Sequence, residues 1–104
     1  IDFSHHYARG GGAANRYDDF RAMLERVRSR LGDASLGRIH VHLSGIAYGP
    51  SGERHHLPLA KSRFCWREVL RALRDAGAGG RVIAESPEIE RDALKLQRAY
   101  RRLP

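Results

Sequence analysis

Three short apolar segments lie along the chain, and each is followed by polar residues and an amphipathic stretch. The segments read IDFSHHYAR, RIHVHLSG and RVIAES, and each is expected to be a β-strand; in the second, Ile39, Val41 and Leu43 alternate with His40 and His42. The amphipathic stretches carry apolar residues at helical spacing. The expected helices cover residues 16–31, 63–76 and 88–102. Residues 46–61 are expected to form a long loop.

Strands that alternate with helices of this length are typical of a parallel sheet built from βα units. Eight such units would give a (β/α)8 barrel of about 250 residues or more. Three units alone would leave two open sheet edges. We therefore expect an α/β fold consisting of the C-terminal three βα units of a TIM barrel, with parallel strands and outer helices. Residues 1–104 would be the C-terminal part of a single barrel domain, a fragment that starts without a Met.

The chain is strongly basic, with 19 Lys and Arg residues against 12 Asp and Glu residues and a formal charge of +7. This surplus, almost all of it Arg, favours phosphate-bearing partners. An Arg-rich surface from a GC-biased genome explains the charge equally well. The single cysteine, Cys65, excludes an internal disulfide and fits a reducing compartment, so a cytoplasmic location is expected. No apolar run approaches the roughly 20 residues of a membrane helix, so no membrane partner is expected.

Carboxylate and imidazole groups fall at the ends of the expected strands or in the loops that follow. These ends form the reactive face of parallel α/β folds, so the groups are expected to converge. The candidate ligands are Asp2, His5, His42, Glu53, His55 and Glu85. Oxygen and nitrogen donors without a thiolate suit catalytic zinc, or manganese or iron. A pair of such metals about 3.5–4 Å apart is the usual arrangement for phosphoester cleavage.

Several of these residues also have a purely structural interpretation. Asp2 could cap a helix or pair with an Arg, and His42 could be satisfied by a neighbour inside a barrel. Glu85 is the hardest to explain without a function, because a carboxylate at the end of a buried strand needs a partner. The remaining imidazoles are interpreted as structural or solvated. They are His6, His40 and His56.

Four motifs, in order along the chain, resemble those of the endonuclease IV family of apurinic/apyrimidinic endonucleases. IDFSH resembles the D-x-x-H strand of that family, and VHLSG its H-L-N-D strand end. GERHH resembles its D-R-H-H loop, and VIAESP its L-E-T-P strand end. The resemblance covers the chain from Ile1 to Leu103. Two departures are Glu53, where the family usually has Asp, and HLSG in place of HLND.

The resemblance implies a trinuclear zinc site. Asp2, His42 and Glu85 would serve a close zinc pair and form the catalytic set. The third zinc would be held by His5, Glu53 and His55. Two further His residues and a bridging Glu belong to earlier strands that this chain does not contain. The expected contacts to DNA are Arg54, which would face a substrate phosphate, and Arg9 and Arg63.

The implied activity is zinc-dependent hydrolysis of the phosphodiester 5′ to an abasic site in duplex DNA, a step of base excision repair. The bound metal would make water nucleophilic near neutral pH. One alternative is a sugar isomerase or epimerase of the xylose-isomerase-like barrels, which use one or two metals and lack the GERHH-type loop. Another is a truncated piece that has no activity of its own, even where the parent protein is an enzyme.

Overall fold

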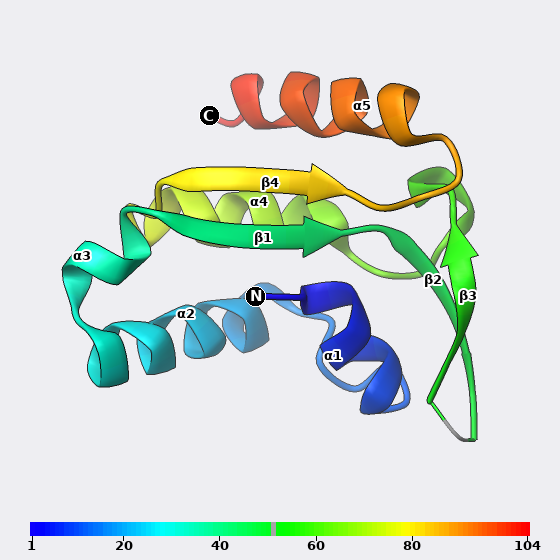
Figure 1. The fold of residues 1–104 in the computed structure, drawn as a ribbon, viewed down its shortest axis with the longest axis horizontal. Helices are drawn as coiled ribbons and strands as arrows, with labels where there is room; N and C mark the ends of the chain where they lie inside the picture. Colours follow the sequence, from blue (N-terminus) through cyan, green and yellow to red (C-terminus); the bar gives the residue numbers. More distant parts are fainter. Residues whose placement is uncertain (51) are drawn as a thin grey trace.

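The computed structural model describes residues 1–50 and 52–104, and the side chains of all of these except Gly52 and Glu53. Among the described residues, three helices come first along the chain, followed by three short strands, a 3₁₀ turn, and then a helix, a strand and a last helix (Figure 1). No helix among the described residues is long and apolar enough to cross a membrane. The elements are α1 (Phe3–Arg9), α2 (Tyr17–Leu31), α3 (Asp33–Leu36), β1 (Ile39–Leu43), β2 (Gly45–Gly49), β3 (Gly52–Leu57), the 3₁₀ turn η1 (Leu59–Lys61), α4 (Trp66–Asp75), β4 (Gly80–Ala84) and α5 (Ile89–Arg101).

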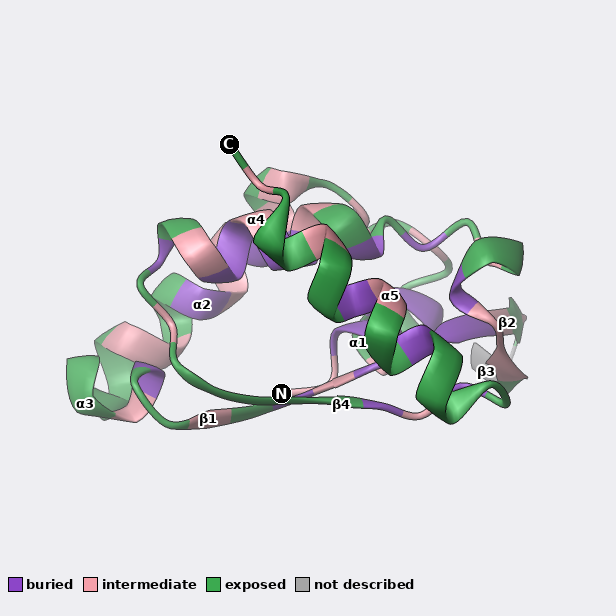
Figure 2. Ribbon diagram, turned by 90° about the horizontal axis from the view of Figure 1, so that it is seen from above, coloured by how far each residue is buried: buried purple, intermediate pink, exposed green. Residues whose placement is uncertain are grey.

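A two-layer arrangement of parallel strands and helices forms the centre of the molecule. β1 and β4 pair in parallel, from Ile39 opposite Gly80 to Leu43 opposite Ala84. α4 packs between α2 and α5, and these helices lie over one face of the strands (Figures 1 and 2). The buried apolar residues come from all of these elements and from α1. The largest of them that are fully buried are Phe3, Phe20, Leu24, Leu36, Leu43 and Leu59.

A β-hairpin replaces the long loop that was expected over residues 46–61. β2 and β3 pair antiparallel, with Ile46 opposite His56 and a register shift after Ala47. The hairpin follows β1 after only one residue, so it begins where the parallel strands end (Figure 1). Gly45 permits this turn, because a Cβ atom at that position would lie 2.5 Å from the backbone oxygens of Leu57 and Pro58. The hairpin thus holds its second strand beside the ends of β1 and β4.

The expected fold class, three parallel βα units of a TIM barrel, is wrong. Within the described residues, β1 and β4 form a two-stranded parallel sheet, and β2 and β3 form a separate antiparallel one. The segment expected to be the first strand is instead helix α1. Only Asp2 keeps a strand-like contact, an isolated parallel bridge to His42. The structure is therefore a small α/β arrangement with two short sheets.

Helix α1 forms because a local cap and a core-facing stripe both favour it. The Asp2 carboxylate caps the helix by accepting a hydrogen bond from the His5 backbone N–H at 2.9 Å. Phe3, Tyr7 and Ala8 then share one side of the helix and are buried. Alternation at the first three residues of the chain had suggested a strand, but the helical spacing of these three residues decides the outcome.

The other predicted elements are confirmed within a few residues. α2, α4 and α5 match the three expected helices, and β1 and β4 match the second and third expected strands. Their apolar patterns are long or strongly periodic, so they specify the element without help from distant contacts.

Candidate metal centre

Three candidate ligands from distant parts of the chain meet at the ends of the parallel strands. Asp2 precedes α1, His42 lies near the end of β1, and Glu85 directly follows β4. One ligand atom from each of the three lies within 4.8 Å of the other two. Their side chains are 31%, 39% and 33% exposed, respectively. This exposure is enough for an ion and water to enter, while most of each side chain remains sheltered.

Backbone hydrogen bonds set this convergence. The backbone N–H of His42 donates to the carbonyl of Ile1 at 2.8 Å, which holds Asp2 beside β1. The N–H of Glu85 donates to the carbonyl of Leu43 at 2.9 Å and so continues the pairing of β4 with β1. The three segments therefore run side by side in the order residues 1–2, β1 and β4. Their functional side chains emerge at the same end.

The side chains of the cluster hold one another in place. Nδ1 of His42 lies 2.9 Å from Oε1 of Glu85, within ion-pair distance. If Nδ1 is the protonated nitrogen that donates to the carboxylate, Nε2 carries the lone pair that a metal would need. Asp2 contacts the imidazole Nδ1 of His5 through Oδ2, while Oδ1 caps α1. Each of these ligands is thus oriented by a partner, as in protein metal sites.

A second layer of imidazoles lies against this cluster. Nδ1 of His56 lies 2.8 Å from the backbone carbonyl oxygen of Glu85. A carbonyl can only accept, so this nitrogen carries the proton and donates. The rings of His5 and His56 meet edge to face with centroids 5.4 Å apart. His56 therefore links β3 to the segment that carries Glu85.

The other three predicted ligands are His5, His55 and Glu53, and of these the structure places only His5 in contact with the cluster of Asp2, His42 and Glu85 among the described residues. His5 is half-buried on α1 and contacts Asp2. His55 is exposed on β3, and no described contact joins it to Asp2, His42 or Glu85. The side chain of Glu53 lies outside the described residues. Because adjacent strand residues point to opposite faces, His56 and not His55 reaches the ring of His5 in the described structure.

The three arginines expected to contact DNA are all exposed. Arg9 ends α1, Arg54 lies on β3, and Arg63 lies between η1 and α4. The described contacts of Arg63 involve its backbone carbonyl, which accepts a hydrogen bond from the Asn15 side-chain amide at 3.0 Å. The guanidinium groups of all three remain available to solvent.

Two polar contacts that the sequence did not reveal anchor the segments around the cluster. Ser4 donates from its hydroxyl to the carbonyl of Ser44, and the Ser44 N–H donates back to the Ser4 hydroxyl, both at 2.9 Å. This reciprocal pair ties α1 to the end of β1. The second contact centres on Asp92 of α5, which is fully buried and accepts hydrogen bonds from the Ser86 hydroxyl and the Leu59 N–H. The signal for Asp92 in the sequence was a carboxylate among the apolar positions of the expected helix.

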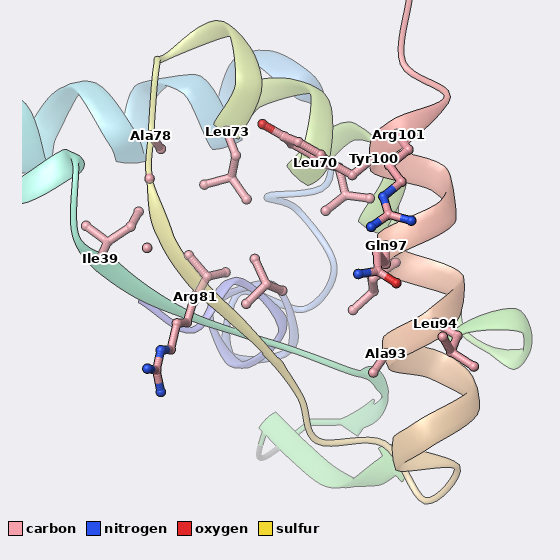
Figure 3. A pocket seen from close by; sticks show the side chains of 15 residues that line it. Ile39, Leu70, Leu73, Ala78, Arg81, Ala93, Leu94, Gln97, Tyr100 and Arg101 are labelled. Carbon is pink, nitrogen blue, oxygen red and sulfur yellow. The ribbon is translucent and has the colours of Figure 1, made fainter.

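A large cavity lies away from these ligands. It measures about 640 Å³ and lies between the parallel strands and the helices α4 and α5 (Figure 3). Aliphatic side chains such as Ile39, Leu70 and Leu73 line much of it, and Asp2, His42 and Glu85 do not. The cavity therefore offers mainly apolar surface, and none of the three candidate metal ligands faces it.

Comparison with known proteins gives one informative match. The chain is 52% identical over 103 residues to the uncharacterized protein MJ0133 of Methanocaldococcus jannaschii. The match covers 99% of this chain but only 38% of that protein's length. No family model and no solved structure matches the chain.

Proposed function

We propose that this chain supplies part of the metal centre of a zinc-dependent hydrolase that cleaves the phosphodiester 5′ to an abasic site in DNA. The observation that carries the proposal is the convergence of Asp2, His42 and Glu85 from three separate segments. The resemblance of the four motifs to endonuclease IV supports the choice of substrate, and the charge of +7 is compatible with a DNA partner.

The donor set of this cluster fits a divalent ion. Two carboxylates and one imidazole are ligands that catalytic zinc takes, and manganese and iron accept the same types. Two carboxylates brought close together disfavour one another's ionised forms unless a cation lies nearby. His42 beside Glu85 and His5 beside Asp2 give each carboxylate a neighbouring imidazole. Zinc held by such a set would polarise a phosphoryl oxygen and would make a bound water nucleophilic near neutral pH.

The protein's own residues would prepare the site for this chemistry. His42 and Glu85 fix each other's orientation, and His56 donates to the backbone of Glu85. His5 and the α1 cap hold Asp2. These contacts hold the candidate ligands in position before a substrate arrives, which is how preorganised metal sites avoid rearrangement during reaction.

Incision of abasic DNA by the full-length protein tests the proposal. Metal analysis of the purified protein should find zinc, with about three ions per chain if the trinuclear set implied by the resemblance is complete. Glu85→Gln keeps the size of the side chain but removes its charge, so it should abolish incision of an abasic duplex and lower the zinc content. Glu90→Gln, at an exposed position on α5, is the matched control and should leave both unchanged.

Two outcomes would count against the proposal. Incision that survives Glu85→Gln would remove this cluster from the chemistry. Aldose–ketose interconversion without incision would assign the metal centre to a sugar isomerase, the alternative that uses the same ligand types.

The cytoplasmic location expected from Cys65 belongs to the proposal as well, because a DNA-repair enzyme without disulfides would work in a reducing compartment.

A further inference from the structure

A strongly basic groove lies between α5 and the start of α4, in a part of the molecule that the metal centre does not use. Its volume is about 250 Å³, and its lining is dominated by cationic side chains. The groove residues that matter here are Trp66, Arg67, Arg91, Lys95, Arg98 and Arg102. We refer to this surface as the α4–α5 groove.

Three of these cations form a row on α5, and Arg102, the C-cap residue of this helix, continues the row. Arg91, Lys95, Arg98 and Arg102 are separated by steps of four, three and four residues, so they share one face of the helix. The remaining faces of α5 are used otherwise. Leu96 and Asp92 are buried in the core, and Figure 3 shows Gln97 and Tyr100 beside the apolar cavity. The cationic row therefore belongs to the outer surface, where much of α5 is exposed (Figure 2).

The groove contains far more positive than negative charge. Among the described residues, the one carboxylate within ion-pair distance of these five cations is Glu88, which lies 3.9 Å from Arg91. Some arginines elsewhere in the described structure are paired more closely. Arg28 of α2, for example, contacts Glu25 at 2.7 Å and Asp33 at 3.0 Å. Repulsion between clustered cations is relieved when an anion binds among them.

One cation of the groove is held in place before any ligand binds. The Arg67 guanidinium lies over the Trp66 ring, 4.3 Å from its centroid. Such stacking restricts the side chain while leaving its N–H groups free to donate. The Trp66 ring is 4% exposed, so the groove itself has little apolar surface for insertion into a lipid bilayer.

We propose that the α4–α5 groove binds the phosphodiester backbone of a nucleic acid. The row from Arg91 to Arg102 spans about 16 Å along the helix, at 1.5 Å per residue. One strand of duplex DNA places a phosphate every 3.4 Å along its axis, so roughly five phosphates fall within this span. The row is therefore long enough to face several successive phosphates of one nucleic-acid strand. The inference rests on the proposed function in one respect, that nucleic acid is the partner, but it requires no catalysis.

Binding of the full-length protein to a 30-base-pair duplex of random sequence, measured in EDTA, tests the groove separately from the metal centre. The test variant carries Arg91→Gln, Lys95→Gln, Arg98→Gln and Arg102→Gln. The control variant loses the same charge elsewhere, through Arg26→Gln, Arg30→Gln, Arg38→Gln and Arg81→Gln. Circular dichroism and thermal melting confirm that both variants fold.

The expected effect follows from counterion release. Each phosphate contact contributes about −0.9 to the slope of log K against log salt, so two contacts give about −1.8 and four give about −3.6. Two contacts alone correspond to roughly 60-fold in affinity between 0.1 M and 1 M salt. We expect the test variant to bind at least about 50-fold more weakly than wild type at 0.1 M salt, with a shallower slope. The control should lose no more than about fivefold.

Equal losses in the two variants would overturn the proposal, because only net charge would then matter. It would also fail if the groove cations were needed for binding to phosphatidylserine vesicles but not to the duplex. Loss of binding to duplex DNA or duplex RNA supports it, and comparison of the two identifies the source of the backbone. Failure of the metal centre leaves this result unchanged, because the measurement needs neither zinc nor incision.

Discussion

Replacement of Asp92 measures how strongly the fold holds the segments around the candidate metal centre. This carboxylate is fully buried on α5, and its Oδ2 accepts hydrogen bonds from the Leu59 N–H at 2.9 Å and the Ser86 hydroxyl at 2.5 Å. Ser86 directly follows Glu85, and Leu59 lies two residues after the end of β3, the strand that carries His56. Asp92 therefore joins α5 to both segments that approach the site from this side.

The structure allows the cost of Asp92→Ala to be estimated. The substitution removes the acceptor of two buried donors, and each unsatisfied donor costs about 1–3 kcal/mol. Two effects reduce the sum. The Ser86 hydroxyl can rotate toward another acceptor, and Asp92 itself has a buried Oδ1 with no hydrogen-bond partner among the described residues. We expect a net loss of about 2–4 kcal/mol, a large part of the 5–15 kcal/mol that stabilises a typical domain.

Urea unfolding of the full-length protein, followed by circular dichroism, measures this loss. Glu90→Ala, at an exposed position of the same helix, should change the free energy of unfolding by no more than about 0.5 kcal/mol. Asp92→Asn keeps one acceptor oxygen and loses only the assistance of the charge, so we expect a cost near 1 kcal/mol. If Asp92→Ala were as mild as Glu90→Ala, the two hydrogen bonds would not stabilise the fold, and this account of how Glu85 is held would be refuted.

Three further predictions concern individual residues. His56→Ala removes a hydrogen-bond donor to the backbone of Glu85 and should weaken zinc binding by about 10–100-fold in calorimetry. His55→Ala should instead lower the zinc content by about one ion if the ligand set implied by the resemblance holds. Gly80→Ala should lower the free energy of unfolding in urea by at least about 2 kcal/mol, because the φ angle of Gly80 is +122° and a Cβ atom would lie 2.0 Å from the Ile39 carbonyl oxygen. Gly77→Ala should cost about 1 kcal/mol, because no atom lies within 4 Å of the added Cβ and only the positive φ opposes the substitution. Burial and the neighbouring Tyr48 raise the pKa of Tyr7 from 10.0 to about 12. The unfolded chain then releases this proton at lower pH than the folded one, so stability should fall by about 2–3 kcal/mol between pH 10 and 12, and Tyr7→Phe should remove that part of the pH dependence.

Three of the helices, α2, α4 and α5, and two of the strands, β1 and β4, could be predicted from the sequence because their patterns are local. The apolar stripe of α2 and the alternation of Ile39, Val41 and Leu43 with His40 and His42 in β1 each indicate one element. Residues 45–57 could not be recognised as a hairpin from such patterns. The pairing of their two strands is interrupted by a register shift, and the close approach of Gly45 to Leu57 depends on contacts across the turn.

The candidate ligands were predicted better than the scaffold that holds them. Asp2, His42 and Glu85 were expected to converge because Asp2 lies on an expected strand and the other two lie at or near strand ends. The parallel pairing of β1 with β4 brings His42 and Glu85 to the same end of the sheet, as expected. His56 was interpreted as structural or solvated, and its hydrogen bond to the Glu85 carbonyl is a structural role. Its place beside His5 could not be predicted, because residues 46–61 were interpreted as a loop, in which neighbouring side chains have no fixed sides. Once β3 is a strand, alternation places His55 and His56 on opposite faces, and which of them approaches His5 becomes a question of register.

Asp2 shows why a wrong element can still deliver a side chain to the expected place. Capping a helix and binding a metal were treated as alternative roles for this carboxylate, yet the geometry allows both. Oδ1 accepts the hydrogen bond from the His5 N–H that starts α1, while the carboxylate as a whole stays within reach of His42 and Glu85. The helix begins immediately after Asp2, so the residue keeps its bridge to β1 even though the strand goes no further. The position of the Asp2 carboxylate therefore depends on its bridge to β1. This single bridging residue is enough to place it beside His42.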